Sequence, residues 1–290
     1  MGARQFLKAL YRRISQDRVL AISAGVTFYA LLAIFPAIAV LVSIYGIFAD
    51  AKTFHDDIAS MGAILPGGAI EIVTAQIRRV ASNSHHTLGL AALGGILISL
   101  WSANSGVKAM FDALNIVLRE QEKRSFIRLN ATSLAFAAGG LVVAFVAVAV
   151  VLAVPEFLKS LGWSLPQNLV DIARWPVIWV CIALAIALVY RFGPSRNDIP
   201  WRWISWGSAL ASFVWLGASM GFSWYAANFG TYNKTYGSLG AVIGFMTWIW
   251  ISAIIVLVGE ELDELLERMQ RPHDRPDKPH PLETPREARG

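Results

Sequence analysis

The stretch LGAVIGFMTWIWISAIIVLVG, Leu239–Gly259, contains no Asp, Glu, Lys or Arg. It is longer than the roughly 18 apolar residues that a helix needs to cross about 30 Å of hydrocarbon. Lipid offers a polypeptide backbone no hydrogen-bond partners, so a helix, whose backbone bonds are all internal, is the predicted form. This stretch therefore predicts a transmembrane helix.

Five more stretches share this apolar character, which predicts an all-α, polytopic membrane protein with six transmembrane helices. Among the six, the second contains Lys108 and Asp112 and the fourth contains Arg191 near its end, whereas the others carry no charged side chain. The five further spans are Val19–Ala49, Leu88–Ile116, Ala131–Val154, Trp175–Phe192 and Ile204–Asn228.

The composition agrees with this class and excludes several others. The 290 residues are 56% hydrophobic and 16% charged, with a mean hydropathy of +0.51, which is too apolar for an ordinary soluble domain or a disordered chain. The single cysteine, Cys181, permits no intrachain disulfide and no CxxC site. The net charge of +5 does not by itself indicate a nucleic-acid partner, because the cytoplasmic loops of multispanning proteins are rich in Lys and Arg.

Lys and Arg lie mostly on one predicted side of the membrane, and this sets the orientation. That side holds the N-terminal segment, the connections after the second and fourth spans, and the tail after Gly259; the opposite side holds far fewer cations. Under the positive-inside rule, both termini are predicted to be cytoplasmic.

Three parts are predicted along the chain. Residues 1–18 form an amphipathic cytoplasmic interfacial helix, and residues 19–260 form the six-helix transmembrane domain, with a periplasmic helical segment at 50–87. Residues 261–290 form an acidic helix end followed by a disordered, Pro-rich cytoplasmic tail.

Charged side chains are expected to lie on solvated faces at both ends of the chain. In the N-terminal helix the cations lie largely opposite an apolar face, as in a helix resting on anionic lipid. These cations are Arg4, Lys8, Arg12 and Arg13. The carboxylates that follow the sixth span are Glu260, Glu261, Asp263, Glu264 and Glu267.

The second span carries a polar stripe, because its polar residues recur every three or four positions. One interpretation is a hydrophilic cavity lined by Asn104, Lys108 and Asp112, since charged groups at membrane depth often mark a substrate path. The other is an interfacial pair of Lys108 with Asp112 near the cytoplasmic end of the helix. The stripe consists of Trp101, Asn104, Ser105, Lys108, Asp112 and Asn115.

Two other spans add candidate substrate-binding residues. Thr27 and Tyr29 lie in the first span, where Pro36 predicts a kink. Tyr225 and Asn228 lie in an aromatic cluster at the outer end of the fifth span, which indicates either a grip on a headgroup or sugar or an aromatic interface belt. The cavity candidates together are Thr27, Tyr29, Asn104, Ser105, Lys108, Asp112, Asn115, Tyr225 and Asn228.

The sequence predicts no catalytic residue, no metal site and no cofactor. It contains none of the P-loop, HExxH or GxSxG motifs, and the adjacent His85 and His86 have no evident paired ligands nearby. We therefore expect a protein that is not an enzyme. Gly217 with Gly221 and Gly240 with Gly244 have the spacing of residues at close helix contacts.

Five motifs in order resemble the YihY/BrkB family of bacterial inner-membrane proteins, once labelled ribonuclease BN. The resemblance covers roughly residues 5–268 and implies a six-helix, multi-pass protein of the bacterial cytoplasmic (inner) membrane with both ends inside. Family members often carry a small residue where this chain has Glu260. The motifs are AGVTFYALLAIFP, LWSANSGVKAMFDALN, LVYRFGPS, GSALASFVWLGASMGFSWYAANF and YGSLGAVIGFMTWIWISAIIVLVGEELDELL.

The resemblance also implies a role in the cell envelope, since relatives are associated with serum resistance and with export or tolerance of lipid A precursors. We expect a transporter or flippase of an envelope lipid, either a lipid A precursor or a phospholipid. The alternatives are a non-transporting scaffold or accessory protein of envelope biogenesis and a membrane-associated tRNA-processing ribonuclease. Expected partners are membrane lipids, anionic ones included, and a second copy or an envelope protein, but no nucleic acid.

Overall fold

The computed structural model describes residues 2–48, 90–140, 142, 167–196, 205–228 and 238–270. Within these ranges every regular element is a helix, which confirms the all-α class. The number of membrane crossings and the side on which the termini lie stay predictions. The periplasmic segment 50–87, most of the third predicted span and the tail after residue 270 lie outside the described residues.

The helices follow the apolar runs closely. The main differences are at the ends: α7 begins eight residues before its predicted span, and α10 continues eleven residues beyond its span into the acidic segment. Another helix covers residues 126–140. The bounds are α1 (Ala3–Gln16), α2 (Val19–Phe48), α5 (Leu90–Val117), α7 (Gln167–Phe192), α8 (Trp206–Asn228) and α10 (Ser238–Gln270).

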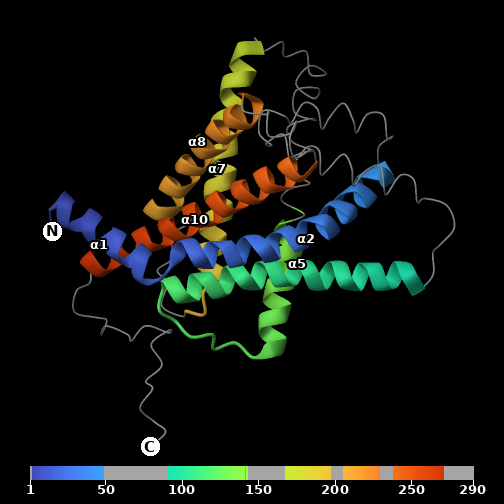
Figure 1. The fold of residues 1–290 in the computed structure, drawn as a ribbon, viewed down its shortest axis with the longest axis horizontal. Coiled ribbons are helices and arrows are strands. Elements are labelled where there is room, and N and C mark those ends of the chain that lie inside the picture. Colours follow the sequence, from blue (N-terminus) through green and yellow to red (C-terminus); the bar gives the residue numbers. More distant parts are fainter. Residues whose placement is uncertain are drawn as a thin grey trace, which may run out of the picture.

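Helices distant in sequence lie side by side (Figure 1). The helices α2 and α5 run antiparallel to each other, and α10 packs against α2, α5 and α8. The helix α1 lies along the C-terminal end of α10. A buried apolar core joins α2, α5, α7, α8 and α10. Its residues are Val19, Val26, Ala113, Leu114, Val117, Ile186, Tyr190, Ala211, Ala253 and Leu257.

One stretch of the described residues, Val242–Met269 in α10, is long and apolar enough to cross a membrane by length and composition alone. Val19–Ala33 and Ile178–Phe192 are shorter apolar helical stretches. A single helix of this kind also occurs in the cores of soluble proteins, so the distribution of side chains over the surface is the stronger observation.

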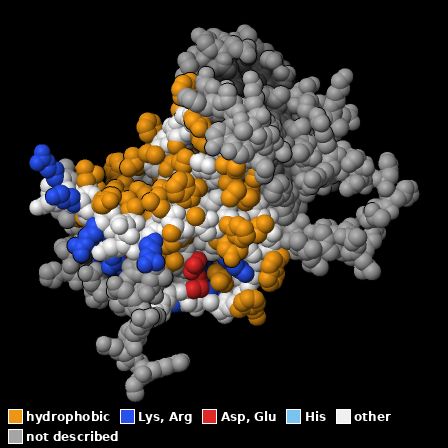
Figure 2. Space-filling model, in the orientation of Figure 1, with side chains coloured by type: hydrophobic (Ala, Val, Ile, Leu, Met, Phe, Trp, Pro, Cys, Tyr) orange, Lys and Arg blue, Asp and Glu red, His pale blue; other side chains and the backbone are white. Residues whose placement is uncertain are grey.

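Large apolar side chains cover the outside of the bundle, while small polar side chains lie inside it. Figure 2 shows apolar groups spread over α8, α10 and α2, with Lys and Arg mainly toward the end where α1 lies. Exposed apolar surface of this extent indicates contact with lipid or with another apolar surface. Exposed examples are Leu20, Phe28, Trp101, Phe213 and Trp224, and buried polar examples are Ser23, Thr27, Ser208, Ser212 and Ser219.

Helices α8 and α10 approach each other closely at Gly207 and Gly259. A Cβ atom at Gly207 would overlap the Gly259 carbonyl oxygen and lie 2.6 Å from Cγ of Asp263. A Cβ atom at Gly259 would overlap the Tyr190 hydroxyl. The expected close contact at Gly217 and Gly221 is not seen among the described residues, where nothing lies within 4 Å of a Cβ atom at either position.

We predict that Gly207→Ala lowers the free energy of unfolding by about 1–3 kcal/mol, because the added methyl group meets backbone that cannot move aside easily. The matched control is Gly217→Ala in the same helix, where the methyl group enters open space. Thermal unfolding of both variants in detergent measures the difference. Equal melting temperatures for the two variants would contradict the assigned helix contact.

Candidate functional site

Four polar side chains from α5 and the helix 126–140 form one hydrogen-bonded group, here called the Asn130 cluster: Asn104, Lys108, Asn130 and Ser133. The Asn104 amide donates to Oδ1 of Asn130 at 2.7 Å, and the Lys108 ammonium donates to the same oxygen. The Ser133 hydroxyl donates to Oδ1 of Asn104. Asn104 and Ser133 are buried, so the cluster joins the two helices through polar contacts.

Lys108 lies at the open edge of the Asn130 cluster, between two aromatic rings. Its Nζ is 5.9 Å from the centroid of Trp101 and 5.7 Å from that of Phe126, distances at which a cation is attracted to a ring face. Trp101 is 69% exposed and Phe126 is 73% exposed. Lys108 itself is part-buried, so this edge holds a partly exposed cation flanked by two exposed aromatic rings.

Of the two interpretations of the stripe, the interfacial pair of Lys108 with Asp112 is not formed: Lys108 bonds to Asn130, and Asp112 is exposed. The physical reason is that the helix 126–140, which the pattern of α5 alone does not place, brings an amide oxygen to the ammonium. Ser105 lies on the same stretch of α5 and donates to the Trp101 carbonyl at 3.0 Å. The hydrophilic cavity beside the stripe stays a prediction.

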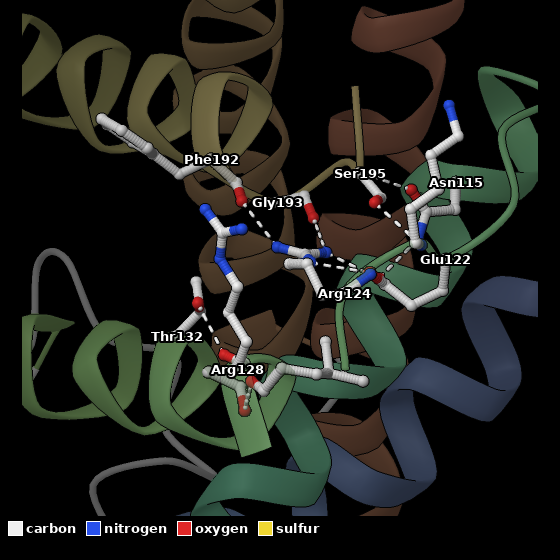
Figure 3. A network of polar contacts seen from close by, with 11 residues as sticks. Asn115, Glu122, Arg124, Arg128, Thr132, Phe192, Gly193 and Ser195 are labelled. Carbon is white, nitrogen blue, oxygen red and sulfur yellow. Dashed lines mark hydrogen bonds and ion pairs between the residues drawn. The ribbon is translucent and has the colours of Figure 1, made fainter. Parts of the chain in front are cut away.

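Asn115 belongs to a second group at the C-terminal end of α5, shown in Figure 3 and here called the Arg124 network: Asn115, Glu122, Arg124 and Ser195. The Asn115 amide donates to Oε2 of Glu122 at 3.1 Å, and its oxygen accepts the Ser195 backbone N–H at 2.8 Å. Asn115 therefore ties α5 to the segment after α7. The sequence stripe placed it beside Lys108, but the structure gives it a separate, connecting role.

Arg124 holds the Arg124 network together. Its guanidinium bonds to both carboxylate oxygens of Glu122, each at 2.7 Å, and donates to the carbonyl oxygens of Phe192 and Gly193 at 3.2 and 2.7 Å. It also lies 5.1 Å from the ring centroid of Phe111. These bonds satisfy carbonyls at the C-terminal end of α7 that have no partner inside the helix.

The surroundings of Glu122 favour its ionised form. Partial burial alone raises its pKa, but hydrogen bonds and charge from Arg124, with a further bond from Asn115, lower the pKa to about 2 from an ordinary 4.5. The charged carboxylate therefore persists in the folded protein at pH values where it is protonated in an unfolded chain.

The remaining candidate residues make contacts with neighbours in their own helices. Thr27 is buried and donates to the Ser23 carbonyl at 2.7 Å, within its own helix. Tyr29 lies edge-on to Phe28, with 5.5 Å between ring centroids, and is exposed. Tyr225 is half exposed and its ring lies 6.2 Å from that of Phe222. The side chain of Asn228 lies outside the described residues.

The acidic end of α10 is a site that the sequence interpretation missed. The predicted solvated face is wrong for Glu260, Glu261 and Glu264, which are buried. Arg13 pairs with Glu261 at 3.2 Å, so Arg13 is buried as well and does not belong to the exposed cationic face of α1. The sequence did contain a pattern that indicates these ion pairs. Acidic residues three and four positions apart share a helix face, and cations in other segments are available to pair with them.

Arg196 and Gly207 complete the contacts at the end of α10. Arg196 pairs with Glu264 at 3.1 Å and with Glu267 at 2.7 Å. The Gly207 N–H, in the first turn of α8, donates to Oδ1 of Asp263 at 2.7 Å. A carboxylate beside a helix N-terminus is favourable because the first N–H groups lack partners within the helix.

Comparison with known proteins places the chain in a family. The family described as "Virulence factor BrkB" matches residues 10–283. The chain belongs to this BrkB family. No solved structure matches it.

Three relatives are similar to this chain over most of its length. The chain is 28% identical to the ribonuclease-like protein YfkH of Bacillus subtilis over 92% of its own length and 96% of YfkH. It is 27% identical to a UPF0761 membrane protein of Chromobacterium violaceum and 25% identical to one of Ralstonia nicotianae, over 88% and 86% of its own length. It spans 60% and 55% of those two relatives. With its apolar surface, this BrkB protein is an integral membrane protein.

We predict that Arg124→Lys lowers the free energy of unfolding by about 1–3 kcal/mol, because an ammonium cannot reproduce the planar fork that bonds Glu122 and two carbonyls together. Arg128→Lys is the matched control, since the Arg128 side chain is exposed. Thermal unfolding of both proteins compares them. If Arg128→Lys lowered the stability as much as Arg124→Lys, the result would contradict this role of Arg124.

The lowered pKa of Glu122 predicts sensitivity to acid. The folded state binds its proton less readily than the unfolded chain, so the stabilisation is present above pH 4.5 and is lost as the pH falls toward about 2. As the pH is lowered through this range, the melting temperature should fall more steeply for the wild type than for Glu122→Gln. Parallel curves would show that Glu122 does not carry the acid dependence.

Proposed function

We propose that this BrkB protein is a multi-pass transporter or flippase of the bacterial inner membrane that moves an anionic envelope lipid. Lys108, at the open edge of the Asn130 cluster, would contact the phosphate of the lipid headgroup. A lipid A precursor and an anionic phospholipid share this phosphate chemistry. The proposal includes no enzymatic activity, cofactor or nucleic-acid partner.

The single observation that carries the proposal is the position of Lys108. An ammonium has three N–H donors and bonds Oδ1 of Asn130 with one of them, so it keeps capacity for an anionic ligand. The exposed rings of Trp101 and Phe126 beside it suit the boundary between headgroup and acyl chains, where aromatic side chains are enriched. A cation with apolar neighbours matches a lipid, which joins a phosphate to hydrocarbon.

A second observation supports lipid as the ligand. The exposed surfaces of α2 and α8 are apolar, as Phe28, Leu32, Phe213 and Val214 illustrate, and neither helix contains a charged residue. Acyl chains that contact this surface bury apolar area, which contributes about 25 cal/mol per Å². The headgroup at Lys108 and acyl chains on the adjacent helix α2 would then bind together.

We predict that the purified protein in liposomes moves fluorescent phosphatidylglycerol between leaflets faster than fluorescent phosphatidylcholine. Lys108→Ala should slow movement of the anionic lipid roughly five- to tenfold, since one cation near a membrane surface contributes about 1 kcal/mol of attraction. Chemical quenching of label in the outer leaflet measures the rate.

Lys8→Ala is the matched control, because it removes one exposed cation from α1 and leaves the Asn130 cluster intact. Equal rates for the wild type and Lys108→Ala would contradict the site. Lack of lipid movement by the wild type, with a stoichiometric protein partner in the purified sample, would favour the scaffold alternative. Cleavage of tRNA precursors by the purified wild type would support the ribonuclease alternative instead.

A further inference from the structure

Two turns at one end of the α2–α5 pair each contain an arginine in the left-handed backbone conformation. Arg18, between α1 and α2, has φ 50°, and Arg119, just after the end of α5, has φ 54°. No other residue except glycine has a positive φ in the part of the chain that the structure describes. An L-residue in this conformation brings its Cβ atom close to the next carbonyl oxygen, a cost that glycine avoids.

The backbone hydrogen bonds explain the conformation of both turns but not the choice of arginine. The Arg18 N–H donates to the Ser15 carbonyl at 3.3 Å, and the Arg119 N–H donates to the Ile116 carbonyl at 3.0 Å. The N–H of the residue after Arg119 donates to the Asn115 carbonyl at 2.8 Å. These bonds are typical of helix ends at which glycine takes the left-handed position. The fold therefore needs this backbone shape, whereas the guanidinium groups need another explanation.

The register of α2 against α5 places the two arginines at the same level. A Cβ atom at Gly106 would lie 3.2 Å from Cβ of Ala33 and 3.5 Å from Cα of Ala30, so these positions face each other. The two helices run antiparallel, and each rises about 1.5 Å per residue. Arg119 lies thirteen residues after Gly106, and Arg18 lies twelve residues before Ala30. Figure 1 accordingly shows the α1–α2 turn and the C-terminal end of α5 at the same end of the bundle.

Both guanidinium groups keep unused donors. Arg18 is exposed, and Arg119 is partly exposed with its Nε buried and without an acceptor. Neither side chain has a hydrogen bond or an ion pair with another described residue, whereas Arg13, Arg124 and Arg196 are all ion-paired. A buried donor of a permanent cation is costly without an acceptor, so an anion that supplies one would bind favourably.

The carboxylates next to these arginines in the sequence lie inside the fold. Asp17 and Glu120 are buried, and both have partners of their own. Glu120 accepts a bond from Nζ of Lys123 at 3.1 Å. An approaching ligand therefore meets the two arginines, which reach the surface, before it meets a carboxylate.

We propose that Arg18 and Arg119 form a binding site for a phosphate group at the end of the bundle where α1 lies. A guanidinium is planar and donates two parallel N–H bonds to phosphate oxygens, which an ammonium cannot do. The phosphate belongs either to an anionic lipid headgroup or to a soluble phosphate compound. Lys108 lies eleven residues before Arg119, roughly 16 Å along the helix axis, so this site is separate from the proposed headgroup contact.

Thermal unfolding of the full-length protein in a neutral detergent tests the site, because a ligand that binds the folded state raises the melting temperature. The probes are inorganic phosphate and dihexanoyl phosphatidylglycerol, compared with potassium chloride at equal ionic strength and with dihexanoyl phosphatidylcholine. We expect the melting temperature to rise with at least one of the two anionic probes beyond its comparison. A rise with phosphatidylglycerol alone identifies a lipid headgroup, whereas a rise with inorganic phosphate identifies a site that also accepts soluble phosphate.

The decisive variant carries Arg18→Gly together with Arg119→Gly. Glycine suits the left-handed conformation, so the variant should be at least as stable as the wild type without a probe. Its apparent Kd for the anionic probe should rise roughly tenfold or more, since two charge-assisted contacts are lost. Arg4→Gln is the matched control, because it removes an exposed cation at the other end of α1, and it should keep the wild-type affinity.

An unchanged Kd in the double glycine variant would overturn the proposal, as would a melting temperature that no anionic probe raises beyond its comparison. A double variant that is less stable without a probe but equally responsive to it would show that the arginines serve the fold alone. Lys108→Ala should still respond to the probe. The phosphate site can therefore fail while the proposed lipid movement stands, and the reverse also holds.

Discussion

A polar group buried beneath an apolar surface must find its partner inside the protein, and this constraint organises the described helices. The contact between α8 and α10 shows it clearly. The Trp215 indole donates to the Ser252 hydroxyl at 2.9 Å, and the Trp248 indole donates to the Ser219 hydroxyl at 3.1 Å. Each helix thus contributes one tryptophan and one serine, and the reciprocal pairs fix how the two helices are rotated and offset. Apolar packing alone specifies neither, because lipid tails compete equally well for apolar side chains.

The same constraint applies more strongly to charge at the end of α10. Breaking one partner of a buried ion pair is far more costly than forming the pair is favourable, so buried charges specify which segments meet. Arg13 brings α1 to α10, and Arg196 brings the segment after α7 to the same helix. Gly207 and Gly259 let α8 pack against the same part of α10, because side chains at those positions would keep the two helices apart. The C-terminal part of α10 is therefore the element against which α1, the segment after α7 and the start of α8 are positioned.

The sequence predicted the helices well and their contacts poorly, for a physical reason. Helix length and apolar content are local properties, so the limits of α2, α5 and α8 agree with the predicted spans within two residues. The partner of Lys108 depends on where the helix 126–140 lies, and no local spacing carries that information. The apolar run also ended the sixth span at Gly259, although the helix continues to Gln270. Acidic residues stop a hydropathy pattern, but they do not stop a helix whose carboxylates are paired.

The two polar groups along α5 differ in how fully their charged side chains are bonded within the protein. In the Arg124 network the Glu122 carboxylate and the carbonyls of Phe192 and Gly193 are all engaged by one guanidinium, which itself lies over Phe111. A group satisfied in this way gains nothing from a ligand and would lose bonds by accepting one. Lys108 differs because its ammonium is part-buried at the edge of the cluster and has, among the described residues, one oxygen acceptor and two aromatic neighbours. Ligands bind where protein groups keep unused capacity, so the proposed headgroup contact is at the Asn130 cluster, whereas the Arg124 network connects segments of the fold.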